Sequence, residues 1–132
     1  MVRGSILTMT LMAGLAVLPG PAISATLFIS NEKDNTVTVI DSETLKVVKT
    51  IATGARPRGM VLSPDFKELF VCAGDDSRLD VIDTEKLEIV RTMSSGPDPE
   101  LLDVDHKGER IYVANEDDGY VTVMQRHDGK IL

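Results

Sequence analysis

The feature that most limits what this chain can fold into is an internal repeat with a period of 42 residues. The segment Leu27-Phe-Ile-Ser-Asn31 returns as Leu69-Phe-Val-Cys-Ala73 and again as Ile111-Tyr-Val-Ala-Asn115. In the same way, Thr36-Val-Thr-Val-Ile-Asp41 returns as Arg78-Leu-Asp-Val-Ile-Asp83. Three copies without an insertion predict stacked supersecondary units, none of which can bury its apolar face alone.

Each repeat unit has the pattern of four short strands separated by tight turns. In the first unit the expected strands, rich in Val, Ile and Thr, lie near residues 27–31, 36–41, 46–52 and 58–63. Four strands in a unit of about 40–45 residues are typical of a propeller blade. We therefore predict an all-β fold, a β-propeller of four-stranded antiparallel blades.

Residues 1–25 have the order of a secretory signal peptide. Arg3 supplies a positive charge, residues 6–18 contain no charged side chain, and small residues at 22–25 provide a cleavage site. The apolar stretch is short for a bilayer core of about 30 Å, which favours cleavage over a retained membrane anchor. We expect an exported, periplasmic protein that keeps no membrane segment after cleavage.

The remaining residues, 26–132, hold about two and a half repeats, at about 27–68, 69–110 and 111–132. A closed propeller has roughly four to eight blades, so this domain is expected to form only part of a ring. The chain is interpreted as the N-terminal portion of a longer protein. Two alternatives stay open: a truncated product without function, and several copies that assemble into one ring. The open blade edges also predict self-association.

Composition narrows the function classes. With 21 acidic and 14 basic residues, the net charge of −7 argues against a nucleic-acid binder. The single cysteine, Cys72, excludes an intrachain disulfide, and its place in a strand favours a small buried side chain over a nucleophile. The sequence holds no Cys-x-x-Cys-His, Gly-x-Ser-x-Gly or His-Glu-x-x-His motif. We expect no catalytic residues, no metal site and no cofactor.

One change between repeats stands out as a candidate site. Arg56 and Arg58 in the first unit correspond to Asp98 and Glu100 in the second, just before the expected innermost strand. Loops leading to inner strands open near the central channel of a propeller. Arg56, Arg58, Asp98 and Glu100 are therefore predicted to form a polar channel mouth that binds a partner protein or a small anion. A purely structural ion pair between blades is the alternative.

The repeat phrases resemble a known family. Leu27-Phe-Ile-Ser-Asn31, Ile111-Tyr-Val-Ala-Asn115 and Leu62-Ser-Pro-Asp65 are similar to the YVTN-type propeller repeats of exported bacterial and archaeal proteins. Ser30-Asn-Glu-Lys-Asp-Asn35 and Ser95-Gly-Pro-Asp-Pro-Glu100 more narrowly resemble the periplasmic propeller associated with PQQ-dependent alcohol catabolism. The resemblance covers all of residues 26–132.

The resemblance implies a function that the residues alone do not define. It implies an exported, non-catalytic binding or scaffold protein whose partner is a periplasmic quinoprotein dehydrogenase or cytochrome. The alternative is a piece of a propeller enzyme, either a lactonase or hydrolase, or a haem-binding domain like that of a nitrite reductase.

Overall fold

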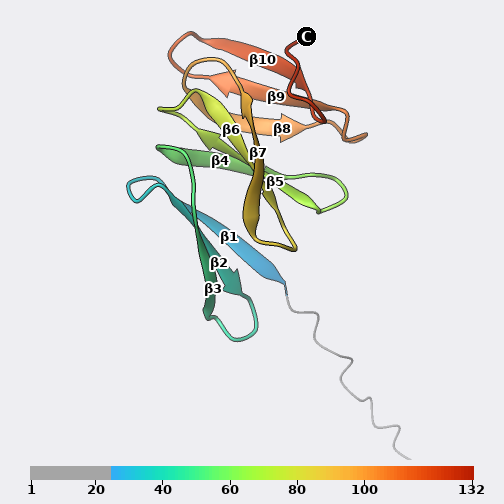
Figure 1. Ribbon diagram of the computed structural model, residues 1–132. Helices are drawn as coiled ribbons and strands as arrows, with labels where there is room; N and C mark the ends of the chain where they lie inside the picture. The colour runs from blue at the N-terminus through green and yellow to red at the C-terminus, as the bar shows by residue number, and fades with distance from the viewer. Residues whose placement is uncertain (1–24) are drawn as a thin grey trace, which may run out of the picture.

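The computed structural model describes residues 25–132, and these residues form strands and turns (Figure 1). The predicted signal peptide lies outside the described residues, apart from its last residue, Ala25. Within residues 25–132 there is no helix of the length and apolar character that a bilayer crossing requires. The all-β prediction is confirmed.

Ten strands follow one another in this part of the chain. The four strands expected in the first repeat are found with bounds that differ by at most one residue. The strands are β1 (Thr26–Asn31), β2 (Thr36–Asp41), β3 (Val47–Ala52), β4 (Pro57–Leu62), β5 (Glu68–Ala73), β6 (Arg78–Asp83), β7 (Glu88–Ser94), β8 (Pro99–Val104), β9 (Arg110–Asn115) and β10 (Tyr120–Gln125).

The strands form three antiparallel sheets. The first sheet has the order β1-β2-β3, the second β4-β5-β6-β7 and the third β8-β9-β10. Figure 1 shows the sheets stacked face to face, with the second between the other two and the edge strands β4 and β8 side by side. The second sheet is one complete four-stranded blade. The first sheet corresponds to its last three strands and the third sheet to its first three, so the described residues form a partial propeller.

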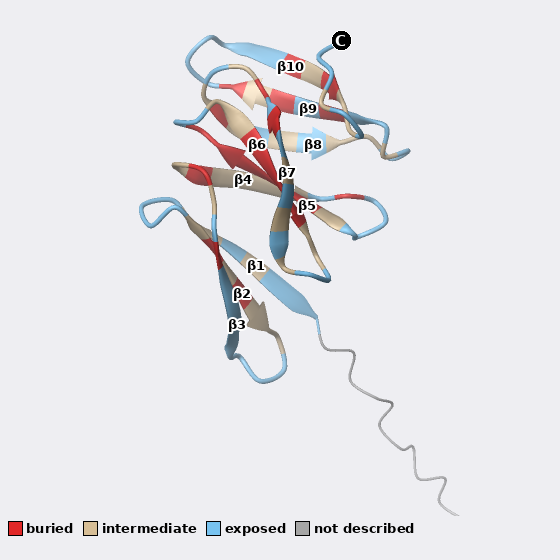
Figure 2. Ribbon diagram, in the orientation of Figure 1, coloured by how far each residue is buried: buried red, intermediate tan, exposed pale blue. Residues whose placement is uncertain are grey.

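The apolar core lies in two layers, one on each face of the second sheet. Alternation along β5 explains both layers, since Leu69 and Val71 face the first sheet while Phe70 and Cys72 face the third. The middle sheet is accordingly the most buried part of the molecule (Figure 2). Each buried Val, Leu, Ile or Phe stabilises the fold by about 1.5–3 kcal/mol.

The turns also follow the repeat. Asn35, Ser77 and Gly119 end equivalent hairpin turns, and their φ angles are 55°, 51° and 64°. The ladder of β2 with β3 shifts register between Val39 and Ile40, and the ladder of β6 with β7 shifts at the position 42 residues later. The repeat therefore determines backbone irregularities as well as strand positions, although the left-handed conformation favours glycine and only Gly119 is one.

Candidate functional site

The four predicted site residues lie at the starts of the adjacent strands β4 and β8. Arg56 and Asp98 each come directly before a proline that begins one of these strands, and Arg58 and Glu100 follow that proline. Arg56 and Asp98 both have left-handed backbones, with φ angles of 58° and 42°. A non-glycine residue in this conformation is strained, and such strain is often found at functional sites.

The structure brings all four side chains into one ion-pair cluster. Arg56 pairs with Asp98, and Arg58 pairs with Glu100, in direct contact. Arg56 also reaches Glu100, with 3.3 Å between Nη2 and Oε1. Both acidic side chains are largely buried, and both arginines are about one-third exposed. The cluster therefore joins the second sheet to the third and still has access to solvent.

Gly74 makes room for the Arg56 guanidinium. A Cβ atom at Gly74 would lie 2.8 Å from the Arg56 Nε, which is closer than real contacts allow. The same Nε lies 3.2 Å from the carboxylate of Asp75, which follows Gly74 in the turn. Burial would lower the pKa of Arg56, but the hydrogen bond to Glu100 and the charge of Asp75 outweigh it and raise that pKa. The arginine is therefore held in its charged form.

A third strand end adds Glu116 to the cluster. Its Oε2 lies 3.8 Å from the Arg58 Nη1, and its side chain is mostly exposed. The hydrogen bond with Glu100 and the charge of that neighbour raise the pKa of Glu116. Counting Asp75 and Asp98, two guanidinium groups face four carboxylates, so the cluster has a surplus of negative charge.

Three of these carboxylates are close enough to act on one cation. Oxygen atoms of Asp98, Glu100 and Glu116 lie within 4.8 Å of one another. The two arginine side chains already neutralise Asp98 and Glu100, so a metal ion would have to displace existing ion pairs. The carboxylates of Glu116 and Asp75 are the two in the cluster that remain mostly exposed.

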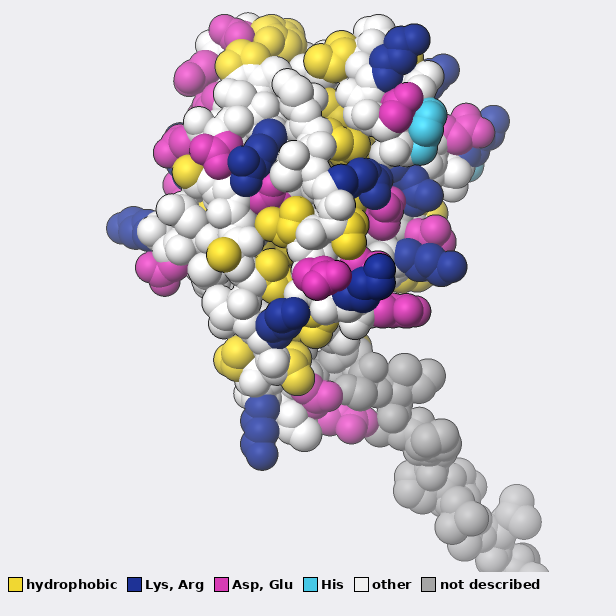
Figure 3. Space-filling model, in the orientation of Figure 1, with side chains coloured by type: hydrophobic (Ala, Val, Ile, Leu, Met, Phe, Trp, Pro, Cys, Tyr) yellow, Lys and Arg dark blue, Asp and Glu magenta, His cyan; other side chains and the backbone are white. Residues whose placement is uncertain are grey.

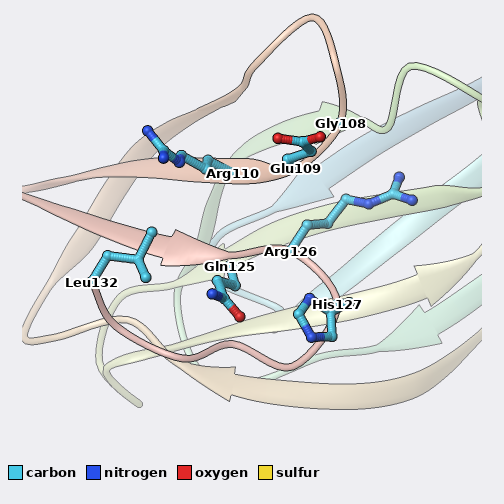
Figure 4. A pocket seen from close by; sticks show the side chains of 7 residues that line it. All are labelled: Gly108, Glu109, Arg110, Gln125, Arg126, His127 and Leu132. Carbon is cyan, nitrogen blue, oxygen red and sulfur yellow. The ribbon is translucent and has the colours of Figure 1, made fainter.

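A shallow cavity of about 470 Å³ lies at the opposite ends of the strands. Figure 4 shows that Arg110 and Arg126 point in different directions from its wall, so their charges do not converge on one point. Arg126 instead approaches Asp65 at 3.6 Å and Glu68 at 3.8 Å. Charges of both signs are interspersed over the face shown in Figure 3. This cavity offers no convergent set of binding groups.

The sequence interpretation missed a polar contact beside the charged cluster. Asp80, on β6, is fully buried and accepts a hydrogen bond of 2.6 Å from the Gly54 backbone N–H. Arg78 Nε donates to the other oxygen at 2.8 Å. The repeat alignment carries the signal, because Thr38 and Thr122 occupy the equivalent positions. An aspartate where the other two repeats have threonine indicates that this side chain has a specific charged or hydrogen-bonded partner.

The equivalent loop one repeat later is held by a different residue, Asn115 on β9. Its amide donates to the Ser95 carbonyl at 3.0 Å and also to the Pro97 carbonyl. Its Oδ1 accepts from the Thr122 hydroxyl at 2.8 Å. In both cases a middle strand of one sheet holds the loop that leaves the outer strand of the preceding sheet.

Cys72 lies in the core between the second and third sheets and is fully buried. Burial raises the pKa of its thiol to about 12, and the charge of Glu100 adds to the effect. Because the thiolate is the reactive form, a thiol in this state is a packing group, as the sequence analysis expected.

Stacked antiparallel sheets, one of four strands and two of three, follow a repeat of 42 residues and define the class of the protein as a β-propeller. The family model of the YNCE-like beta-propeller matches residues 4–132. The chain therefore belongs to the YNCE-like β-propeller family. No match was found among curated proteins.

Solved structures of larger proteins contain the same arrangement. Hydrazine synthase from Kuenenia stuttgartiensis is 26% identical with a TM-score of 0.75, over 81% of this chain and 31% of that chain. The dihydro-heme d1 dehydrogenase NirN, in complex with DHE, is 21% identical with a TM-score of 0.72, over 89% of this chain and 26% of that chain. A functionally unknown protein from Desulfotomaculum acetoxidans is 17% identical with a TM-score of 0.67, over 89% of this chain and 43% of that chain. The last two likenesses show the fold alone, and the chain spans less than half of each of these structures.

Proposed function

We propose that this chain is an exported propeller that acts as a binding or scaffold protein and not as an enzyme. The observation that carries the proposal is the charged cluster at the starts of β4 and β8, where Glu116 and Asp75 present exposed carboxylates around fixed arginines. The ligand would be a basic patch of a partner protein. The apolar segment at residues 6–18 supports export.

The resemblance to the propeller associated with PQQ-dependent alcohol catabolism supports a choice of partner. We take the partner to be a periplasmic quinoprotein dehydrogenase or its cytochrome. Electrostatic recognition between charged surfaces mainly raises the association rate and weakens with salt. Binding that depends on the cluster should therefore fall as the ionic strength rises.

The test must separate recognition from the structural role of the ion pairs. Glu116→Gln and Asp75→Asn remove exposed charges and leave the pairs between Arg56, Arg58, Asp98 and Glu100 in place. Glu85→Gln, in an exposed turn at the other end of the strands, is the matched control.

Binding is measured by biolayer interferometry, with the immobilised chain and a purified quinoprotein alcohol dehydrogenase or its c-type cytochrome. We expect binding at low salt that the two cluster variants weaken at least threefold and that the control leaves unchanged. Equal binding by all variants, or none at low salt, would exclude recognition at this cluster. Loss of stability without loss of binding in Arg58→Ala and Glu100→Ala would leave the cluster a purely structural role.

A second candidate is a segment of a propeller enzyme. The likeness to a hydrazine synthase favours it, although it covers only 31% of that chain. Titration of the chain with haem, followed by absorbance, tests the haem-binding form of this candidate. A saturable shift of the Soret band would support it over the scaffold function.

A further inference from the structure

An acidic side chain at the start of β6 is held by two partners in the complete second sheet. Asp76 lies in the turn between β5 and β6, and Arg78 begins β6. The Arg78 Nη1 lies 3.5 Å from the Asp76 Oδ2. The same oxygen accepts a hydrogen bond of 3.0 Å from the Ala55 backbone N–H. Asp76 therefore has a guanidinium and a backbone donor from its own chain.

Both partners are replaced one repeat later. The acid itself is kept, as Asp118 in the turn between β9 and β10. Tyr120 replaces the arginine, and Pro97 replaces the alanine. Tyrosine is uncharged at neutral pH, and proline has no backbone N–H to donate. Asp118 is exposed and has no ion pair within residues 25–132.

The tyrosine lies over the same part of the loop as the arginine. Gly54 and Gly96 are equivalent residues in the loops that lead into β4 and β8. A Cβ atom on Gly54 would lie 3.0 Å from the Arg78 Nη2. A Cβ atom on Gly96 would lie 3.3 Å from the Tyr120 hydroxyl oxygen. Tyr120 therefore takes the place of the guanidinium, and 46% of the residue is exposed.

Tyr120 and Asp118 are close enough to act on one ligand. Partial burial, the charge of Asp118 and the hydrogen bond between the two side chains all raise the pKa of Tyr120. The carboxylate accepts this bond from a neutral hydroxyl, so its negative charge is not compensated. An exposed aromatic ring and an unpaired carboxylate thus lie side by side.

This arrangement belongs to the third sheet and the loop that leads into it, both of which the structure describes. The second sheet has a neighbour on each face, and the side chains of Asp76 and Arg78 there are still 37% exposed. By the same repeat, a blade packed on the outer face of the third sheet would leave Asp118 open to solvent.

We propose that Asp118 and Tyr120 form a site for an arginine side chain of a partner protein. The inference rests on the proposed function, because the site shares its turn with Glu116. In the second sheet the chain fills the equivalent place with its own guanidinium. A guanidinium can bond the carboxylate and also stack on the tyrosine ring, whereas an ammonium group has no planar face for stacking.

The test is a titration of the full chain at low salt with two short peptides, followed by proton–nitrogen correlation NMR. One peptide carries arginines between glycines, and the other carries lysines at the same positions. We expect the amide signals of Gly119 and Tyr120 to shift saturably with the arginine peptide. The lysine peptide should bind about threefold more weakly or worse.

Two variants and a matched control locate the binding. Asp118→Asn should weaken binding of the arginine peptide about threefold. Tyr120→Arg introduces the residue of the second repeat, whose own guanidinium should fill the site and weaken binding as well. Asp34→Asn should leave binding unchanged, because Asp34 has the same turn position in the first sheet but lies beside Thr36 instead of a tyrosine. Signals away from the turn show that each variant is folded.

Three results would overturn the proposal: no saturable shift at low salt, equal affinity for the two peptides, or equal weakening by Asp118→Asn and Asp34→Asn. None of them would decide recognition at Glu116 and Asp75, which has its own test with purified partner proteins. Failure of that test would likewise leave saturable arginine binding at Asp118 in place, so the two proposals fail separately.

Discussion

Replacing Asp80 is expected to produce a large loss of stability. Its carboxylate is fully buried and bonds both the Gly54 N–H and the Arg78 side chain. In Asp80→Ala the buried N–H is left without a partner and the arginine loses its counter-ion. Gly54 lies in the loop between β3 of the first sheet and β4 of the second, so the change also loosens the connection between these two sheets.

The magnitude follows from what remains after the change. Removing one member of a buried ion pair costs about 3–5 kcal/mol. Arg78 is about one-third exposed and can turn to water or to Asp76, so we expect the lower end, about 3 kcal/mol. Asp80→Asn keeps an oxygen for the Gly54 N–H and loses only the charge, so about 1–2 kcal/mol is expected.

The measurement is urea unfolding followed by circular dichroism. With a slope of about 1.5 kcal/mol/M, the midpoint of Asp80→Ala should fall by about 2 M, and that of Asp80→Asn by about half as much. Glu85→Ala, at an exposed turn, should change the free energy of unfolding by less than about 0.5 kcal/mol. A loss below about 1 kcal/mol for Asp80→Ala, or equal losses for both variants, would refute this account of the contact.

Three further results are expected. Glu116→Gln should raise the melting temperature at neutral pH, because the raised pKa of Glu116 means that its ionised form opposes folding. The difference in melting temperature should vanish as the pH falls through that raised pKa to the ordinary value for glutamate. A difference that stays constant with pH would contradict this explanation. Gly59→Ala should cost about 1–3 kcal/mol in urea unfolding, since its Cβ would lie 2.5 Å from the Glu100 backbone oxygen, whereas Gly119→Asn, in an open turn whose equivalent holds asparagine, should be nearly neutral. Cys72 should react with Ellman's reagent at pH 8 only after denaturation, and fast labelling of the folded chain would show that it is accessible.

The strands and their grouping could be predicted because the repeat gives each one two or three times. Alternation of apolar residues in segments such as 36–41 defines a strand with one face toward each neighbour, and the turn residues define its ends. The pairing of Arg56 and Arg58 with Asp98 and Glu100 was also within reach, since equivalent positions in adjacent blades lie side by side.

The rest of the charged cluster depends on geometry that sequence spacing does not contain. Asp75 and Glu116 lie in hairpin turns, and the position of an acidic residue in a turn does not indicate which strand end its side chain will contact. The buried Asp80 gave a visible signal, a carboxylate in an apolar strand. Its partner is a backbone N–H in the loop between β3 and β4, which a pattern of side chains cannot identify.

Departures from the repeat show where each interface is adapted to its own neighbour. Gly59 lies where the backbone of β8 comes closest to β4, and the equivalent residue in the third sheet is Leu101, which is exposed. A leucine there prevents any neighbour from approaching β8 as closely as β8 approaches β4.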